Sequence, residues 1–216
     1  MNARYHAVLI ALLALGLSAS AAGAATVSHW ASMPLQTTDW YTTLSFPKFN
    51  PATGTLQSVT IEIRDSLVHK IEFENKSPSS SSTFSDSTYV TVDVTRPAST
   101  SFVTAIAKIH RTASVGTFDG VVDYAGTSGV TMDGIVDYAI STTTTSAPAD
   151  LALFSGVGTI GLPCQAVATF MFGYNGGNAS FKLTTQAAAM VQVTYSYDGA
   201  TPAANSSWGR IKSLYR

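Results

Sequence analysis

Residues 191–197 read VQVTYSY, and this alternation of apolar and polar side chains decides the fold class. Val191, Val193, Tyr195 and Tyr197 recur with a period of two. Successive side chains of a β-strand point to opposite faces of the sheet, so the period predicts one buried and one solvent-facing side. The pattern therefore indicates a half-buried strand.

The same period recurs along most of the chain after Thr26. Further strands are predicted around Ile61–Ile63, Ile71–Phe73 and Val90–Val94, and at Thr42–Phe46, Phe102–Ile109, Val115–Tyr124, Ile135–Thr142, Val167–Phe172 and Ala179–Thr185. About ten strands at this short spacing are typical of a sandwich or jelly roll. A helical period of useful length does not follow residue 26. We therefore predict an all-β fold, an antiparallel β-sandwich or jelly-roll-like single domain.

Turn-forming residues separate these segments. Asn50–Gly54 (NPATG) predicts a turn, because Pro sets one φ and Gly permits a positive one. Asn175–Asn178 (NGGN) predicts a short hairpin turn between the strands on either side. The Ser-rich residues 77–87 predict an exposed loop, and Thr142–Ser146 is a second polar stretch.

The N-terminus has the features of an export signal. Arg4 precedes an apolar run at 7–17, and Ala22-Gly23-Ala24 supplies small residues where signal peptidase cleaves. We expect residues 1–24 to be a signal peptide, with cleavage between Ala24 and Ala25 and a secreted or extracellular location. The alternative is an uncleaved anchor helix, although the apolar run is short for a membrane span.

Composition narrows the function classes. The chain has 216 residues, 45% of them hydrophobic, only 12% charged, and a formal net charge of -1. Without a basic stripe interleaved with aromatics, nucleic acid is not expected as a partner. Cys164 is the single cysteine, so an intramolecular disulfide is impossible. We expect Cys164 to be a buried small apolar residue.

Four aspartates form the one acidic cluster of the sequence. Asp119 and Asp123 lie in DGVVDY, which recurs as DGIVDY with Asp133 and Asp137. We interpret the repeat as two adjacent strands, Val121–Tyr124 and Ile135–Tyr138, each entered through an Asp-Gly turn. If those strands pair, the carboxylates would converge as a candidate calcium site, or as an acid pair for sugar hydrolysis. The alternative is ordinary turn aspartates.

Aromatic residues suggest a binding hypothesis. Trp30, Trp40, Tyr41, Tyr195 and Tyr197 would stack on sugar rings if they formed a platform, and the alternative places them in the core. The mature chain's histidines are isolated: none has the spacing of a zinc site. We assign no catalytic residue and no cofactor.

Several segments together resemble the bacterial choice-of-anchor E domain across roughly residues 37–198. They are FPKFNP (46–51) with GTLQSVTI (54–61), FDGVVDY (118–124) with GTSG (126–129), DLALFSGVGT (150–159) and VTYSY (193–197). The resemblance implies an exported bacterial protein of unassigned molecular function. Relatives typically end in a sorting signal, often of the PEP-CTERM type, and no ligand or catalytic residues are established for the family.

The C-terminus departs from that family pattern. Residues 199–216 have no Pro-Glu-Pro motif, apolar span or terminal arginine cluster. We therefore expect a domain at 25–198, a tail at 199–216 without an anchor, and release from the cell; a truncated gene would look the same. The expected function is that of a secreted, non-enzymatic protein of the extracellular matrix or cell surface. The alternatives are a carbohydrate-binding module and, third, a glycan hydrolase. Expected partners are extracellular polysaccharide or other surface proteins.

Overall fold

A computed structural model describes residues 24–98 and 100–199. These residues form eight strands, one short α-helix and one turn of 3₁₀ helix. The elements are β1 (Ala24–Thr37), β2 (Trp40–Pro47), η1 (Pro51–Thr53), β3 (Gly54–Asn75), β4 (Ser82–Thr95), β5 (Ser101–Val115), β6 (Gly129–Thr145), α1 (Pro148–Phe154), β7 (Thr159–Tyr174) and β8 (Ala179–Gly199). The predicted signal peptide, apart from Ala24, and the tail beyond Gly199 lie outside the described residues.

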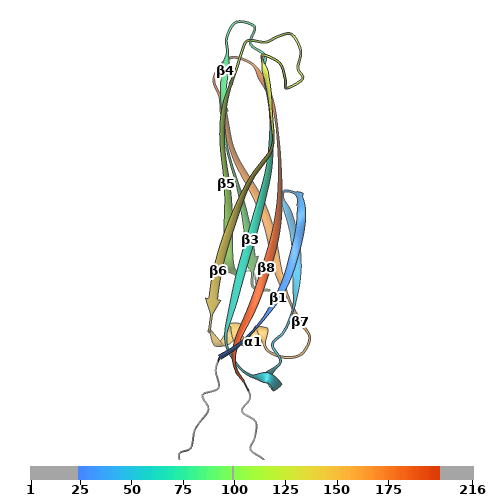
Figure 1. Cartoon of the computed structure of the whole chain (residues 1–216), viewed down its shortest axis with the longest axis vertical. Helices are drawn as coiled ribbons and strands as arrows, with labels where there is room; N and C mark the ends of the chain where they lie inside the picture. The colour runs from blue at the N-terminus through green and yellow to red at the C-terminus, as the bar shows by residue number, and fades with distance from the viewer. Residues whose placement is uncertain (1–23, 99, 200–216) are drawn as a thin grey trace, which may run out of the picture.

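The strands make two four-stranded antiparallel sheets that pack face to face along a narrow, elongated body (Figure 1). We name them sheet A, in the order β1-β8-β3-β6, and sheet B, in the order β2-β7-β4-β5. The predicted all-β antiparallel sandwich is thus confirmed. Among the described residues, no helix is both long enough and apolar enough to cross a membrane.

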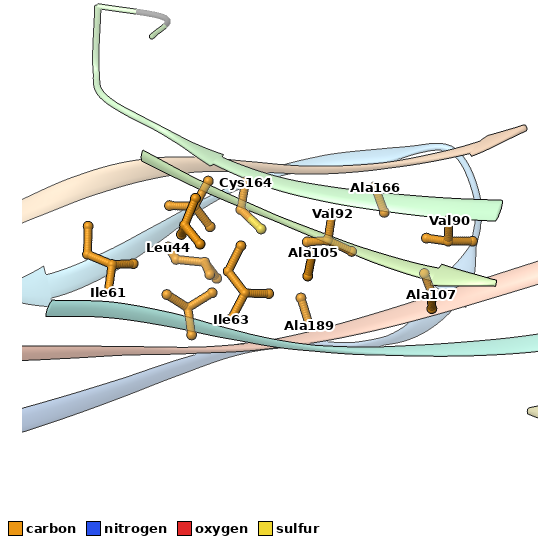
Figure 2. Packing of buried hydrophobic residues seen from close by; sticks show 14 of the residues in the cluster. Leu44, Ile61, Ile63, Val90, Val92, Ala105, Ala107, Cys164, Ala166 and Ala189 are labelled. Carbon is orange, nitrogen blue, oxygen red and sulfur yellow. The ribbon is translucent and has the colours of Figure 1, made fainter. Parts of the chain in front are cut away.

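Alternation builds the core between the sheets. Ile61 and Ile63 of β3 have no solvent exposure, whereas Glu62 between them faces outward and is partly exposed. Figure 2 shows Ile61 and Ile63 pointing toward Val92 and Cys164 of the other sheet. Burying each large apolar side chain contributes about 1.5–3 kcal/mol, which makes this layer the main source of stability. Cys164 is fully buried, and burial raises the pKa of its thiol to about 12.

In two cases, two segments predicted as separate strands belong to one long strand. Ile61–Ile63 and Ile71–Phe73 both belong to β3, and the segments at 179–185 and 191–197 both belong to β8. β3 and β8 pair from Gly54↔Gly199 to Asn75↔Ala179, over nearly their full length. Each long strand alternates throughout, so a local pattern gives no sign of where it ends.

Two predictions about strands and loops are wrong. The predicted strand at Val115–Tyr124 ends at its first residue, because β5 stops at Val115 and the chain turns through 116–128. The Ser-rich segment 77–87, predicted as an exposed loop, instead enters β4 at Ser82. In β4 small hydroxyl side chains alternate with buried Phe84 and Asp86, so a serine-rich composition hides a strand period.

The connections are partly as predicted. Asn50 caps η1, its Oδ1 accepting a hydrogen bond from Ala52 N at 3.0 Å, so the turn at Asn50–Gly54 is confirmed. The turn at Asn175–Asn178 is real but is not a hairpin, because β7 and β8 belong to different sheets. Thr142–Thr145 continues β6. The helix α1 spans only seven residues, too few for a period to show.

Candidate functional site

The predicted aromatic platform does not form. Trp40 is 8% exposed, and its Nε1 donates to Ala187 O at 3.1 Å across the core. Tyr195 is fully buried, its hydroxyl donates to Pro47 O at 2.7 Å, and burial raises its pKa to about 12. Tyr197 is half-buried against Phe49, with ring centroids 5.0 Å apart. These three rings belong to the core and its margin.

Two of the aromatic candidates stay exposed, on opposite faces of the sandwich. Trp30 lies on the outer face of sheet A, with the Arg64 guanidinium 5.4 Å from its ring centroid. Tyr41 lies on the outer face of sheet B and is 66% exposed. Tyr41 is therefore the most exposed of the five aromatic candidates.

Tyr41 borders a hollow of about 260 Å³ on sheet B. The hollow is lined by Tyr41, Asp93, Thr95, Pro97, Pro163 and Gln165. Register explains the arrangement: Tyr41 pairs with Gln165, and Gln165 pairs with Asp93. The three side chains thus stand in one row on neighbouring strands β2, β7 and β4. We call this the Tyr41 hollow.

The row combines an aromatic ring, an amide and a carboxylate. Asp93 Oδ1 accepts hydrogen bonds from Ser101 Oγ at 2.5 Å and Thr104 Oγ1 at 2.9 Å, which hold the carboxylate in place. Within residues 24–98 and 100–199, no donor bonds to the second oxygen, Oδ2. A ring with an apolar face beside a few placed polar groups is the usual composition of a small-ligand site.

A salt bridge fixes the loop that supplies one wall of the hollow. Arg96, next to Pro97, forms a two-pronged contact with Asp150 of α1, Nε–Oδ1 and Nη2–Oδ2 both at 2.8 Å. The guanidinium also stacks over Phe102, 4.0 Å from its ring centroid. The hydrogen bond from Arg96 lowers the pKa of Asp150 below its ordinary value. Bidentate pairs of this kind give directional rigidity, so Pro97 is held in position.

The four aspartates do not converge as two paired strands would require. Asp119 and Asp123 lie in the loop at 116–128, whereas Asp133 and Asp137 lie on β6. Each accepts from a backbone N–H: Val121 for Asp119, Ala125 for Asp123, Gly134 for Asp133 and Lys108 for Asp137. The bond from Val121 lowers the pKa of Asp119. Within residues 24–98 and 100–199, no three His, Cys, Asp or Glu side chains are placed to hold a metal ion.

A buried polar cluster escaped the sequence analysis. His69 Nε2 of β3 lies 3.2 Å from Asp86 Oδ2 of β4, and both side chains have no exposure. Thr88 Oγ1 donates to Asp86, and His69 Nδ1 lies 2.9 Å from Thr185 Oγ1. The sequence did hold a signal for this cluster. His69 lies two residues before Ile71 in β3, so the period of two places its side chain on the same inward face although the residue is polar.

Asp65 is the second missed group. It is 2% exposed on the inward face of β3, and no described residue forms a hydrogen bond with either carboxylate oxygen. Burial raises its pKa to about 7, and the nearby backbone amides of Ala107 and Ser66 offset only part of that effect. His29, by contrast, is half-buried beside Tyr195, and the exposed His110 contacts Ser87 Oγ at 2.9 Å.

Comparison with known proteins adds little to the class that the fold defines, an antiparallel two-sheet sandwich. No family model matches the chain, and no curated protein matches it. One solved structure, "Structure of infectious bursal disease virus Gx strain", aligns at 10% identity with a TM-score of 0.14. The alignment covers 87% of this chain and 47% of that one, so the chain spans about half its length. At that TM-score the likeness carries no argument.

Proposed function

We propose that the protein is an exported, non-enzymatic β-sandwich of the extracellular matrix or cell surface, and that it binds polysaccharide at the Tyr41 hollow. The observation that carries the proposal is the row Tyr41–Gln165–Asp93 on the outer face of sheet B. A sugar ring presents an apolar face that stacks on tyrosine and hydroxyls that bond to amide and carboxylate groups.

The exposure of the site favours a chain-like ligand. The hollow is about 260 Å³, and the Tyr41 ring beside it is largely exposed. A surface site with an exposed ring can hold one unit of a polymer that continues on both sides, whereas small-molecule pockets bury most of their ligand. The polar groups at the site are few, so affinity per sugar unit is low, and several copies on one polymer would add avidity.

The pairing of β1 is compatible with export. β1 pairs with β8 through Ala25↔Tyr197 and Thr26↔Ser196. Cleavage between Ala24 and Ala25 would therefore leave the strand's pairing intact from Ala25 onward.

A polysaccharide-binding assay tests the site. The purified protein is applied to a glycan array and sedimented with insoluble polysaccharides, using Tyr41→Ala and Tyr138→Ala variants. Tyr138 is a matched control, since it is 67% exposed but lies on β6 of the other sheet. We expect Tyr41→Ala to lower affinity by about tenfold, because stacking on an aromatic ring contributes roughly 1–1.5 kcal/mol. Tyr138→Ala should bind like wild type.

Failure of the site and failure of export are separable outcomes. Absence of binding to any glycan, or an equal loss in both tyrosine variants, would refute the hollow as a sugar site.

Export is tested by expressing the full chain in a bacterial host and determining the N-terminus of protein recovered from outside the cytoplasm. The expected N-terminus is Ala25, and a chain that keeps Met1 in the cytoplasm would contradict the proposed location.

A further inference from the structure

β1 and β2, which lie in different sheets, cover only part of one side of the sandwich. β1 pairs with β8 as far as Thr37↔Gln186, and β2 pairs with β7 as far as Trp40↔Ala166. Figure 1 shows the blue β1–β2 connection turning back part way along the body while β7 and β8 continue toward the far end. Beyond this connection, among the described strands, β7 pairs only with β4 and β8 only with β3.

The open part of β7 has the properties of an unprotected strand edge. Residues 167–174 read VATFMFGY, with no charge and no proline; we call them the β7 edge. Phe170 is 57% exposed and Met171 is 61% exposed. Free edges in monomeric proteins are usually blocked by charges, proline or bulges, and an unblocked apolar edge pairs with another strand.

One hydrogen bond shows which backbone groups face the open side. Ala168 N donates to Asp39 Oδ1 at 2.7 Å, and Asp39 lies in the connection between β1 and β2, on the side of β7 away from β4. Amide directions alternate along a strand, and β7 pairs with β4 without a bulge as far as Tyr174. The N–H and C=O groups of Phe170 and Phe172 therefore point to the open side, where no strand within residues 24–98 and 100–199 pairs with them.

We propose that the β7 edge pairs with the same edge of a second copy, joining two sheets B into one antiparallel sheet. A two-fold axis at Met171 places Phe170 opposite Phe172 of the partner copy, which is the hydrogen-bonded pairing that those amide directions require. Met171 then faces its own symmetry mate on the outer side. On the inner side, Phe170 and Phe172 supply aromatic contacts across the join.

The open edge of β7 suits pairing with a second copy better than the open edge of β8 does. The same two-fold arrangement on β8 would centre on Lys182, whose side chain is 66% exposed, and like charges directly opposite each other are destabilising. Residues 167–174 carry no charge of their own, and the Asp39 carboxylate, which bonds to Ala168 N, lies at the end of the ladder and not opposite its own mate. β2 of each copy ends before the shared ladder begins, because Ala166 is the last β7 residue that pairs with it, and Asp39 reaches the ladder only at Ala168.

The size of the contact matches a reversible dimer. An axis at Met171 pairs the seven residues 168–174, which span about 23 Å at about 3.3 Å each, and two sheets about 10 Å apart with their side chains give a width of about 20 Å. Each copy would bury about 450 Å², or about 900 Å² in total, which is the range of weak, reversible interfaces. We therefore expect a concentration-dependent equilibrium between monomer and dimer.

A cysteine placed on the axis gives a direct test. Met171→Cys brings two thiols together at a non-hydrogen-bonded pair, where Cα atoms lie about 4.5 Å apart, within disulfide range. Met190→Cys is the matched control, an exposed methionine of sheet A on β8. Cys164 is fully buried and does not compete. With diamide as oxidant we expect a covalent dimer from Met171→Cys and none above background from Met190→Cys.

Association of the purified protein is measured in parallel by sedimentation velocity. Met171→Lys sets two like charges on the axis and should weaken dimerisation by at least about tenfold, whereas Met190→Lys should not change it. A chain that stays monomeric at every concentration overturns the proposal. So does equal cross-linking of the two cysteine variants, or a stable complex in which a different protein occupies the β7 edge. Tyr41 lies outside this edge, so Tyr41→Ala should dimerise normally.

Discussion

His69 of β3 and Asp86 of β4 join the two sheets through the centre of the sandwich, with Nε2 and Oδ2 3.2 Å apart and both side chains fully buried. Thr88 Oγ1 donates to both Asp86 oxygens, at 3.1 and 3.2 Å. A buried carboxylate tolerates its desolvation only while such partners are present. The pair therefore makes the relative position of β3 and β4 specific, although its net contribution to stability is small.

Removing one member of this pair should be worse than removing both. His69→Leu leaves Asp86 buried without its imidazole partner, and we expect the free energy of unfolding to fall by about 3–5 kcal/mol. The double variant His69→Leu/Asp86→Leu should recover much of that loss. Urea denaturation measures both, with His110→Leu at an exposed site as the control, expected within about 0.5 kcal/mol of wild type. A double variant no more stable than the single one would contradict the prediction.

Asp65 should make the sandwich less stable as the pH rises. Burial raises its folded-state pKa from 3.8 to about 7, so the folded chain holds a proton that the unfolded chain has already released. Between about pH 4 and pH 7 each rise in pH therefore favours unfolding, by up to about 4 kcal/mol in total at 1.36 kcal/mol per pKa unit. Thermal melting of wild type and Asp65→Asn from pH 4 to 8 measures the difference.

The Asp65→Asn variant should lack this part of the pH dependence and melt higher than wild type at pH 8. Asp133→Asn, whose carboxylate is largely exposed, serves as the control and should keep the wild-type slope. Parallel melting curves for wild type and Asp65→Asn across the range would show that Asp65 is not protonated in the folded chain.

The Arg96–Asp150 pair should stabilise the fold more as the pH rises, which is the opposite of the effect of Asp65. Hydrogen bonding from Arg96 lowers the pKa of Asp150 below 3.8, so its contribution is present above that pH and is lost as the pH falls through the folded-state value. Asp150→Asn should cost about 1–3 kcal/mol at pH 7 and much less near pH 2. Arg96→Lys should lose most of the same stability, because a single ammonium cannot form both 2.8 Å contacts.

Calorimetry at the two pH values measures these losses. Asp198→Asn is a suitable control. The Asp198 carboxylate accepts a hydrogen bond from the exposed Gln57 Nε2 at 2.8 Å, and both residues lie on sheet A, whereas Arg96 follows β4 of sheet B. An equal cost of Asp150→Asn at both pH values would show that the pair does not depend on an ionised carboxylate.

Local alternation was enough to predict where most strands lie and which side chains face inward. It predicted Ile61 and Ile63 as one buried set, and the structure confirms them. It failed at Ser82–Asp86, because a serine-rich composition was weighed above the period. It also failed at Val121–Tyr124, where two adjacent valines do not alternate and the chain forms a loop.

The site was less accessible to sequence reasoning than the fold. Tyr41 was a candidate, but so were Trp40 and Tyr195, and side-chain type does not separate a ring in the core from one on the surface. Asp93 and Gln165 lie far apart in the chain, and they meet Tyr41 only because of the register between β2, β7 and β4. Register is a long-range property, set by how whole faces pack.

The sequence by itself determined that this chain is β-structure with a buried and a wet side, because side-chain alternation is a local consequence of extended backbone geometry. Only the tertiary structure decided which strands are neighbours, which polar residues are sealed between the sheets and where an edge of β7 stays open. Those properties depend on contacts between residues such as His69 and Asp86, or Tyr41 and Gln165, that are distant along the chain and come together only when the two sheets close.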